Sequence, residues 1–247
     1  MKNKIVKLLL SVANENKELY SSLTDSVSLT NYKSNNGIWT EAFQKALNEH
    51  EIVIIPSSPE PYYLDNSVLI PSNRRIIAER GATIRLTDTT KVLMLRNTNT
   101  ADGTHTQITT KRNTNISIEG GRWEDWCPHR MGYGGSGMYD EERSFFGVST
   151  CMLLENIDNL TLKNMVFKNC GGFAIQIGEA KNIVIENITF ENCFADGIHV
   201  NGNVENIHIK NVPASKTNSP AHFLYFHSTS SQTLLSTTRS AFRAIFS

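Results

Sequence analysis

The feature that most constrains the fold is an internal repeat with a period in the low twenties. The stretch NLTLKNMVFKNCGGFAIQIG begins at Asn159 and NIVIENITFENCFADGIHVNG begins at Asn182, an offset of 182 − 159 = 23 residues. A third copy, NIHIKN, opens at Asn206, and a weaker earlier copy, NISIEGG, opens at Asn115. Each copy holds short alternating apolar runs that Asn and Gly interrupt, which is typical of one coil of a parallel β-solenoid. The sequence therefore predicts an all-β parallel β-helix.

Stacking of such coils brings equivalent residues into register. Parallel strands lie about 4.8 Å apart, so a residue type that recurs once per coil forms a ladder along the solenoid. Aliphatic and Phe ladders are expected to fill the interior, and Asn at the corners tolerates left-handed backbone and shares hydrogen bonds between coils. Cys170 and Cys193 fall on one ladder and are expected to be buried thiols. A disulfide between them is geometrically conceivable, but composition and a reducing compartment argue against it.

The N-terminal third fits the same architecture. In WTEAFQKALNEH (39–50), Ala42, Phe43, Ala46 and Leu47 fall on one face of a predicted helix. IVIIP, YYLDNSVLIPSN, RRIIAERGATIRL and KVLMLRN then follow as short strands and turns. We expect the helix to cover the open end of the first coil, where unpaired strand edges invite aggregation.

Composition narrows the class of protein. The 247 residues include 24 basic and 24 acidic side chains, and this balance gives no indication of nucleic acid or an anionic membrane as a partner. The N-terminal apolar run LLLSVA is only six residues, shorter than the h-region of a signal peptide, so we expect a cytoplasmic protein, with an extracellular location as the alternative. The four cysteines lack metal-ligand spacing, and we expect neither a metal site nor a cofactor.

These motifs resemble a known superfamily. WTEAFQKALNEHEIVIIPSS, with LIPSNRRIIAERGATIRL after it, is similar to the opening of right-handed parallel β-helix proteins of the pectin-lyase-like superfamily, where an amphipathic helix follows a Gly-Asp-Gly-x-Thr-Asp-Asp turn. Here NNGIWTE keeps the helix but lacks the acidic part of that turn. The resemblance covers about residues 35–212 and implies a right-handed solenoid.

Within that superfamily, CFADGIHVNG resembles the Asn-Thr-Asp-Gly-Ile motif of family 28 glycoside hydrolases, the polygalacturonases and their relatives. The match rests on Asp196-Gly197-Ile198, since Phe194 and Ala195 stand where the family has Asn-Thr. These enzymes invert the anomeric carbon and hold an acid and a base about 6.5–9.5 Å apart. The resemblance implies that Asp196 is one catalytic carboxylate. His199 and Gln176, on the outward phase of their strands, are candidate substrate-binding residues.

The second catalytic carboxylate of the family is missing. By resemblance it belongs to a Gly-Asp-Asp motif one coil later, near residues 217–222, which read TNSPAH. No acidic residue follows Glu205, and the sequence after Pro213 is Ser/Thr-rich without the repeat. We therefore expect an N-terminal segment over 1–34, an incomplete β-helix over 35–212 and an unrelated tail over 213–247, as a frameshift would produce. A solenoid that ends near Val212 would expose a strand edge and promote self-association.

The stretch 122–150 interrupts the repeat and is a candidate binding loop. Trp126 is suited to stacking on a sugar ring, and Arg130 and Arg143 are suited to bidentate recognition of uronate carboxylates. GYGGSG within this loop lacks the Lys-Ser/Thr ending of a phosphate loop.

Plain structural explanations stand beside these assignments. Asp-Gly is a common turn pair, Asp196 aligns with the apolar Phe173, and His199 and His208 fit a solvated strand face. Glu124 or Asp140 is a weaker candidate for a substitute acid. A calcium site like that of pectate lyases would need three or four clustered carboxylates from neighbouring coils, and no such ladder is present in the sequence.

Two classes of function remain. One is a polygalacturonase-like glycoside hydrolase that acts on uronate-containing polysaccharide by inverting hydrolysis, here incomplete and inactive if the second carboxylate is absent. The other is a non-catalytic β-helix, either a polysaccharide-binding or a tailspike-like protein, and a pectate-lyase-like enzyme is a further alternative. Fold alone does not choose between them, because function belongs to the site.

Overall fold

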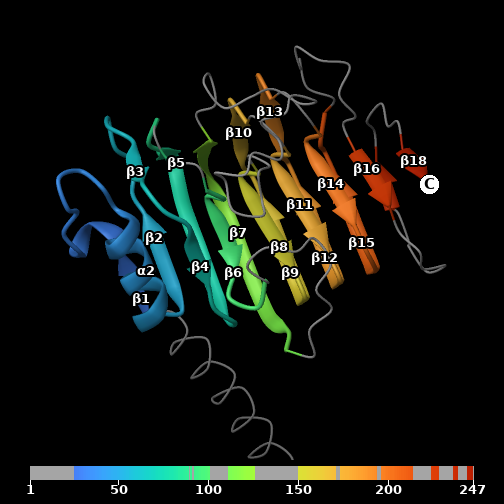
Figure 1. Cartoon of the computed structure of the whole chain (residues 1–247), viewed down its shortest axis with the longest axis horizontal. Coiled ribbons are helices and arrows are strands. Elements are labelled where there is room, and N and C mark those ends of the chain that lie inside the picture. The colour runs from blue at the N-terminus through green and yellow to red at the C-terminus, as the bar shows by residue number, and fades with distance from the viewer. Residues whose placement is uncertain are drawn as a thin grey trace, which may run out of the picture.

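The computed structural model describes residues 25–88, 90, 92–100, 111–125, 150–170, 173–193 and 196–213, together with the backbone of three later strands. Its strands form two long parallel sheets, one of eleven strands and one of seven. They stack side by side along the chain from β1 to β18 (Figure 1). The predicted parallel β-helix is confirmed.

The eleven-stranded sheet supplies the longer sides of each coil. Its main path runs β1 (Ser26–Ser28), β2 (Ile52–Ile55), β5 (Arg74–Leu86), β7 (Asn113–Glu124), β9 (Ile157–Lys163), β12 (Ala180–Glu186), β15 (Val204–Lys210) and β17 (Ser236–Thr238). Three short strands branch from it, namely β3 (Tyr62–Leu64), β10 (Val166–Lys168) and β13 (Thr189–Glu191). The seven-stranded sheet contains β4 (Val68–Ile70), β6 (Leu95–Asn97), β8 (Met152–Glu155), β11 (Ile175–Gly178), β14 (Ile198–Asn201), β16 (Leu224–His227) and β18 (Ala244–Phe246).

The register of the strands confirms the repeat. Ile185 of β12 pairs with Leu162 of β9 at an offset of 23 and with Ile209 of β15 at an offset of 24. The same ladder continues through Ile118 and Ile76, and each of the five side chains is fully buried. Burying an aliphatic side chain of this size stabilises the fold by about 1.5–3 kcal/mol. Each coil therefore adds a buried aliphatic side chain to one continuous core.

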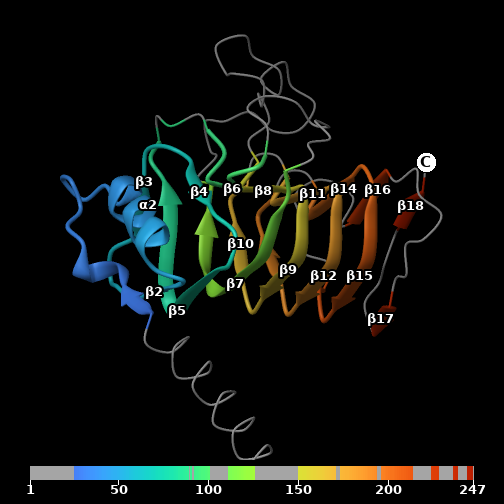
Figure 2. The same ribbon diagram turned by 90° about the horizontal axis from the view of Figure 1, so that it is seen from below.

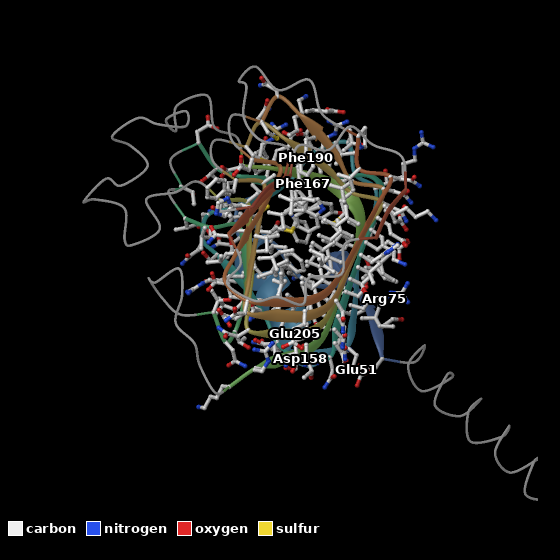
Figure 3. All side chains as sticks on the ribbon, turned by 90° about the vertical axis from the view of Figure 1, so that its right-hand side faces the viewer. Glu51, Arg75, Asp158, Phe167, Phe190 and Glu205 are labelled. Atoms are coloured by element: carbon white, nitrogen blue, oxygen red, sulfur yellow. The ribbon has the colours of Figure 1, made fainter. Side chains whose placement is uncertain are left out.

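Viewed along the solenoid, the division between core and surface is plain (Figure 3). The stacked rings of Phe167 and Phe190, with centroids 5.7 Å apart, lie inside the ring of strands. Arg75, Asp158 and Glu205 lie on the outside. Alternation along each strand sends one residue inward and the next outward.

Asparagine ladders mark the corners, as the sequence predicts. The longest ladder consists of five residues with positive φ, namely Asn73, Asn115, Asn159, Asn182 and Asn206. From Asn115 onward, each Nδ2 donates to the Oδ1 of the asparagine in the preceding coil at 2.8–3.0 Å. A second ladder joins Asn164, Asn187 and Asn211, and a third joins Asn169 and Asn192. Asn visits the left-handed region at low cost, so it suits these bends.

The predicted N-terminal helix is present as α2 (Thr40–Glu49), after the short 3-10 helix η1 (Leu29–Asn31). Its buried face carries the four predicted apolar residues, Ala42, Phe43, Ala46 and Leu47. Gln44 reaches β4, the edge strand of its sheet: Nε2 donates to the Leu69 carbonyl at 2.9 Å and Oε1 accepts from the Leu69 N–H at 2.7 Å. Figure 2 shows α2 at the end of the solenoid where the first coils lie. The helix thus satisfies backbone groups that an uncovered edge would leave unpaired.

Strand pairing continues beyond Val212, where we expected the solenoid to end. The backbones of β16, β17 and β18 pair in parallel with β14, β15 and β16 respectively. The exposed edge that we expected at Val212 is therefore paired along β15. The separate origin of the tail and self-association through a solenoid end stay predictions. No helix in the described part of the chain has the length and apolar character that a membrane span requires.

Candidate functional site

Asp196 lies at the corner that leads into β14, and its side chain is 9% exposed. Its carbonyl accepts a hydrogen bond from the N–H of Ala174, so it stands level with Phe173 of the preceding coil, as the repeat predicts. Gly197 follows directly. A Cβ on Gly197 would lie 2.8 Å from the ring of Phe190, so this position requires glycine.

His199 and Gln176 lie on the outer face of the seven-stranded sheet. Ile198 and Val200 of β14 belong to the core, so the intervening His199 points to the opposite face. The register pairs His199 with Gln176 of β11. Gln176 is 1% exposed, so this part of the outer face is largely shielded from solvent. The structure therefore brings together the predicted outward-phase residues and Asp196.

The Asp196 carboxylate holds the imidazole of His199. Oδ2 lies 2.9 Å from Nδ1, and the His199 ring stacks on Phe173 with centroids 4.0 Å apart and planes 9° from parallel. A carboxylate on Nδ1 fixes the orientation of the ring and favours the tautomer with its proton on Nδ1. A carboxylate and an oriented imidazole form a proton-handling pair. The sequence identified both residues, but not their mutual contact.

The other predicted site residues are not all placed. Arg130, Arg143 and Trp126 lie outside the described residues, as do Asp140 and residues 217–222. Glu124, the alternative acid, is 3% exposed and its Oε2 accepts from Nε of Arg85 at 2.7 Å, so it is committed to a shielded ion pair. In the described ranges, no group of three or more His, Cys, Asp or Glu side chains is arranged to hold a metal ion.

Glu155 is a buried acid that the sequence analysis missed. It ends β8, where Met152 and Leu154 point into the core, so its side chain points to the outer face. It is 2% exposed, and its Oε1 has no hydrogen-bond partner. Burial, together with the nearby carboxylate of Glu179, raises the pKa of Glu155 to about 8. In the strand register, Glu155 pairs with Gly178 of the next coil, which has no side chain. An acid that aligns with a glycine one coil later was the signal in the sequence.

The cysteines in the described part of the chain are buried thiols, as expected for Cys170 and Cys193. Cys151, Cys170 and Cys193 are free and fully or almost fully buried. Burial is the main cause of the raised pKa of Cys170, and a contact with the Cys170 thiol followed by burial raises the pKa of Cys193. Thiols in such surroundings stay protonated and are poor nucleophiles.

No protein-family model matches the sequence, and no curated protein sequence matches it either. Solved structures do match. The surface adhesin PfbA of Streptococcus pneumoniae superimposes with a TM-score of 0.65 at 18% identity, over 87% of this chain and 57% of the adhesin. The family 28 exopolygalacturonase of Yersinia enterocolitica gives 0.60 at 14% identity, over 82% of this chain and 44% of the enzyme.

A third match is the tailspike protein of E. coli bacteriophage HK620, solved in complex with a pentasaccharide. Its TM-score is 0.56 at 15% identity, over 84% of this chain and 39% of the tailspike. This chain thus spans about 40–60% of the length of these proteins. The chain therefore has the right-handed parallel β-helix fold that these solved structures share.

Proposed function

We propose that this chain binds a uronate-containing polysaccharide on the outer face of the seven-stranded sheet, around Asp196, His199 and Gln176. The observation that carries the proposal is the Asp196–His199 contact of 2.9 Å, beside Gln176 on the next coil. The imidazole of His199, whose side chain is 14% exposed, can donate to or accept from a sugar hydroxyl, and the Phe173–His199 stack stiffens the site.

The structural neighbours support a polysaccharide as the ligand. The tailspike was solved with a bound pentasaccharide, and the Yersinia protein is an exopolygalacturonase. A solenoid presents equivalent positions at a regular spacing of about 4.8 Å, which suits an extended polymer. The uronate class rests on the resemblance of Asp196-Gly197-Ile198 to the family 28 motif.

Binding without turnover is the function that the described geometry favours. Inverting hydrolysis needs an acid and a base about 6.5–9.5 Å apart, with room for water between them. The carboxylate of Asp196 is hydrogen-bonded to His199, so its direct partner among the described residues is an imidazole and not a second carboxylate.

A second candidate function is hydrolysis of the same glycan, and the Asp196–His199 pair itself is the observation that favours it. A carboxylate that orients an imidazole is an arrangement that general acid–base catalysis uses. In this alternative, Asp196 acts with a partner from outside the described residues.

The test combines affinity electrophoresis in polygalacturonate with an assay of reducing-sugar release. The variants are His199→Ala, Asp196→Asn and the control His208→Ala, which removes a 40%-exposed histidine of β15. We expect polygalacturonate to retard the wild type and His208→Ala, and His199→Ala to weaken binding about tenfold, the loss of one good hydrogen bond. Reducing-sugar release that Asp196→Asn abolishes would select hydrolysis. A wild-type mobility that polygalacturonate leaves unchanged would refute the proposal.

A further inference from the structure

A hollow lies on the eleven-stranded sheet, several coils from Asp196. It is a groove of about 670 Å³ between the bend that joins the two halves of β5 and the coil that carries β10. Its lining includes Arg80, Thr83, Gly120, Gly121 and Val166. This volume lies in the range of about 300–1,000 Å³ that is usual for small-ligand sites.

A register shift between neighbouring strands creates the groove. Ala78 of β5 pairs with Gly120 of β7, but Thr83 already pairs with Arg122, so residues 79–82 lie opposite Gly121 alone. The extra residues of β5 bulge away from the sheet and form one wall. The bulge is anchored, because Oε2 of Glu79 accepts from the N–H of Ser57 at 2.9 Å.

Bare backbone forms the floor. Gly120 and Gly121 have φ values of +78° and +74°, and a Cβ on Gly120 would lie 2.0 Å from the carbonyl oxygen of Ala78. Both positions therefore require glycine. The result is a half-buried surface of peptide groups without side chains, beside the aliphatic side chains of Ile77 and Val166; the Gly120 carbonyl already accepts from Nε1 of Trp123 at 2.9 Å. Such a surface accepts a flat, partly apolar ring with polar substituents.

The charges that line the groove do not balance. Glu119 is paired with Nη2 of Arg75 at 3.2 Å and accepts from Asn164 at 3.1 Å. Arg122 is paired with Glu191 at 2.6 Å. The exposed Arg80 has no hydrogen-bond or ion-pair partner among the described residues, so its guanidinium is available at the wall of the groove.

We propose that this groove is a second glycan subsite that binds one acidic sugar unit, with the sugar carboxylate on Arg80. A guanidinium presents a planar fork that matches a carboxylate. The Thr83 hydroxyl and the peptide groups of the floor take the sugar hydroxyls, and Val166 contacts the apolar face of the ring. The sugar class rests on the proposed function, but the groove is a separate site on a different sheet.

The experiment is a titration of amide signals with trigalacturonate in ¹H–¹⁵N NMR, with galactose and inorganic phosphate as comparison ligands. The variants are Arg80→Ala, Arg80→Lys and Thr83→Phe, which fills the groove. Lys210→Ala, which removes an exposed cation of β15, is the control. Preserved dispersion of the amide signals shows that each variant is folded.

We expect trigalacturonate to shift the signals of Gly81, Gly120 and Gly121 saturably. Arg80→Ala and Thr83→Phe should each raise the dissociation constant at these signals about tenfold or more, Arg80→Lys should have a smaller effect, and Lys210→Ala should have none. Equal response to galactose or phosphate, or an unchanged constant in Arg80→Ala, overturns the inference. Shifts confined to Gly197 and His199 overturn it while leaving the proposed function intact. Shifts confined to the groove support it and count against the Asp196 site.

Discussion

The carboxylate of Asp196 lies 2.9 Å from Nδ1 of His199, three residues further along the chain and already on strand β14. The sequence raises the question of which group is the partner of Asp196, and this contact gives the answer for the described residues. The family resemblance implies a second carboxylate as its partner, whereas the described residues give it an imidazole. The partner determines which chemistry is open to the site.

The five-membered asparagine ladder predicts a specific response to substitution at Asn182. Asn182 has φ of +54° and hydrogen-bonds to Asn159 and Asn206. Asn182→Ala should lower the free energy of unfolding by about 2–4 kcal/mol, because it loses two hydrogen bonds and places a Cβ-bearing residue without compensation in the left-handed region. Asn182→Gly should cost less, because glycine tolerates the bend. Urea denaturation of both variants measures the difference, and equal losses would show that the backbone conformation is irrelevant.

Steric contact between Gly197 and Phe190 predicts coupling between the two positions. Gly197→Ala should destabilise the chain by about 1–3 kcal/mol, because its Cβ would lie 2.8 Å from the Phe190 ring. In a Phe190→Leu background the same substitution should cost less, since the smaller side chain makes room. A double-mutant cycle from thermal unfolding gives the coupling energy. Additive losses would mean that the ring is not what requires glycine.

Glu155 predicts a pH dependence of stability. Its pKa in the folded chain is about 8, raised above the ordinary carboxyl value by burial and by Glu179. The folded state therefore binds this proton more tightly than the unfolded state. The contribution is fully present below the ordinary carboxyl pKa and is lost as pH rises towards 8. The urea midpoint should fall between pH 5 and 8 and level off above that range.

The matched variants for this prediction are Glu155→Gln and Glu205→Gln. Glutamine keeps the shape of Glu155 without an ionisable group, so Glu155→Gln should flatten the pH dependence. Glu205 is 45% exposed and paired with Lys181 at 3.0 Å, and its replacement should leave the dependence in place. The prediction fails if both variants follow the wild-type curve.

The ion pair of Arg85 with Glu124 predicts that removing the cation alone lowers the stability more than replacing both partners does. Arg85→Met should lower the free energy of unfolding by about 3–5 kcal/mol, because it leaves the 3%-exposed Glu124 carboxylate without its cation. The double variant Arg85→Met/Glu124→Leu should recover much of that loss, since no buried charge remains. Urea midpoints of the wild type, the single variant and the double variant measure these losses. A double variant as unstable as the single one would contradict this account.

The fold was predictable from sequence because each coil repeats the same chemistry. Phe167 and Phe190, or Asn159 and Asn182, occupy equivalent positions 23 residues apart, so periodicity alone predicts their ladders. The bulge at 79–82 was not predictable, since it depends on the register of β5 against β7. The continuation past Val212 was also missed, because β16 to β18 pair through their backbone without the Asn repeat.

The candidate site was predictable only in part. Alternation along β11 and β14 placed Gln176 and His199 on one face, and the offset placed Asp196 level with Phe173. The hydrogen bond between Nδ1 of His199 and the Asp196 carboxylate depends on how the corner turns, which periodicity does not encode. The burial of Glu155 depends on neighbours far away in sequence, so its raised pKa had no local signal.

The most direct test of the central claim follows the ring signals of His199 and His208 by NMR during titration with trigalacturonate. Glycan binding at the outer-face site predicts saturable shifts of the His199 ring signals, while those of His208 on β15 stay in place. Loss of the His199 shifts in Asp196→Asn would tie them to the 2.9 Å contact. Saturable binding of trigalacturonate elsewhere on the chain, with the His199 ring signals unmoved, would contradict the account.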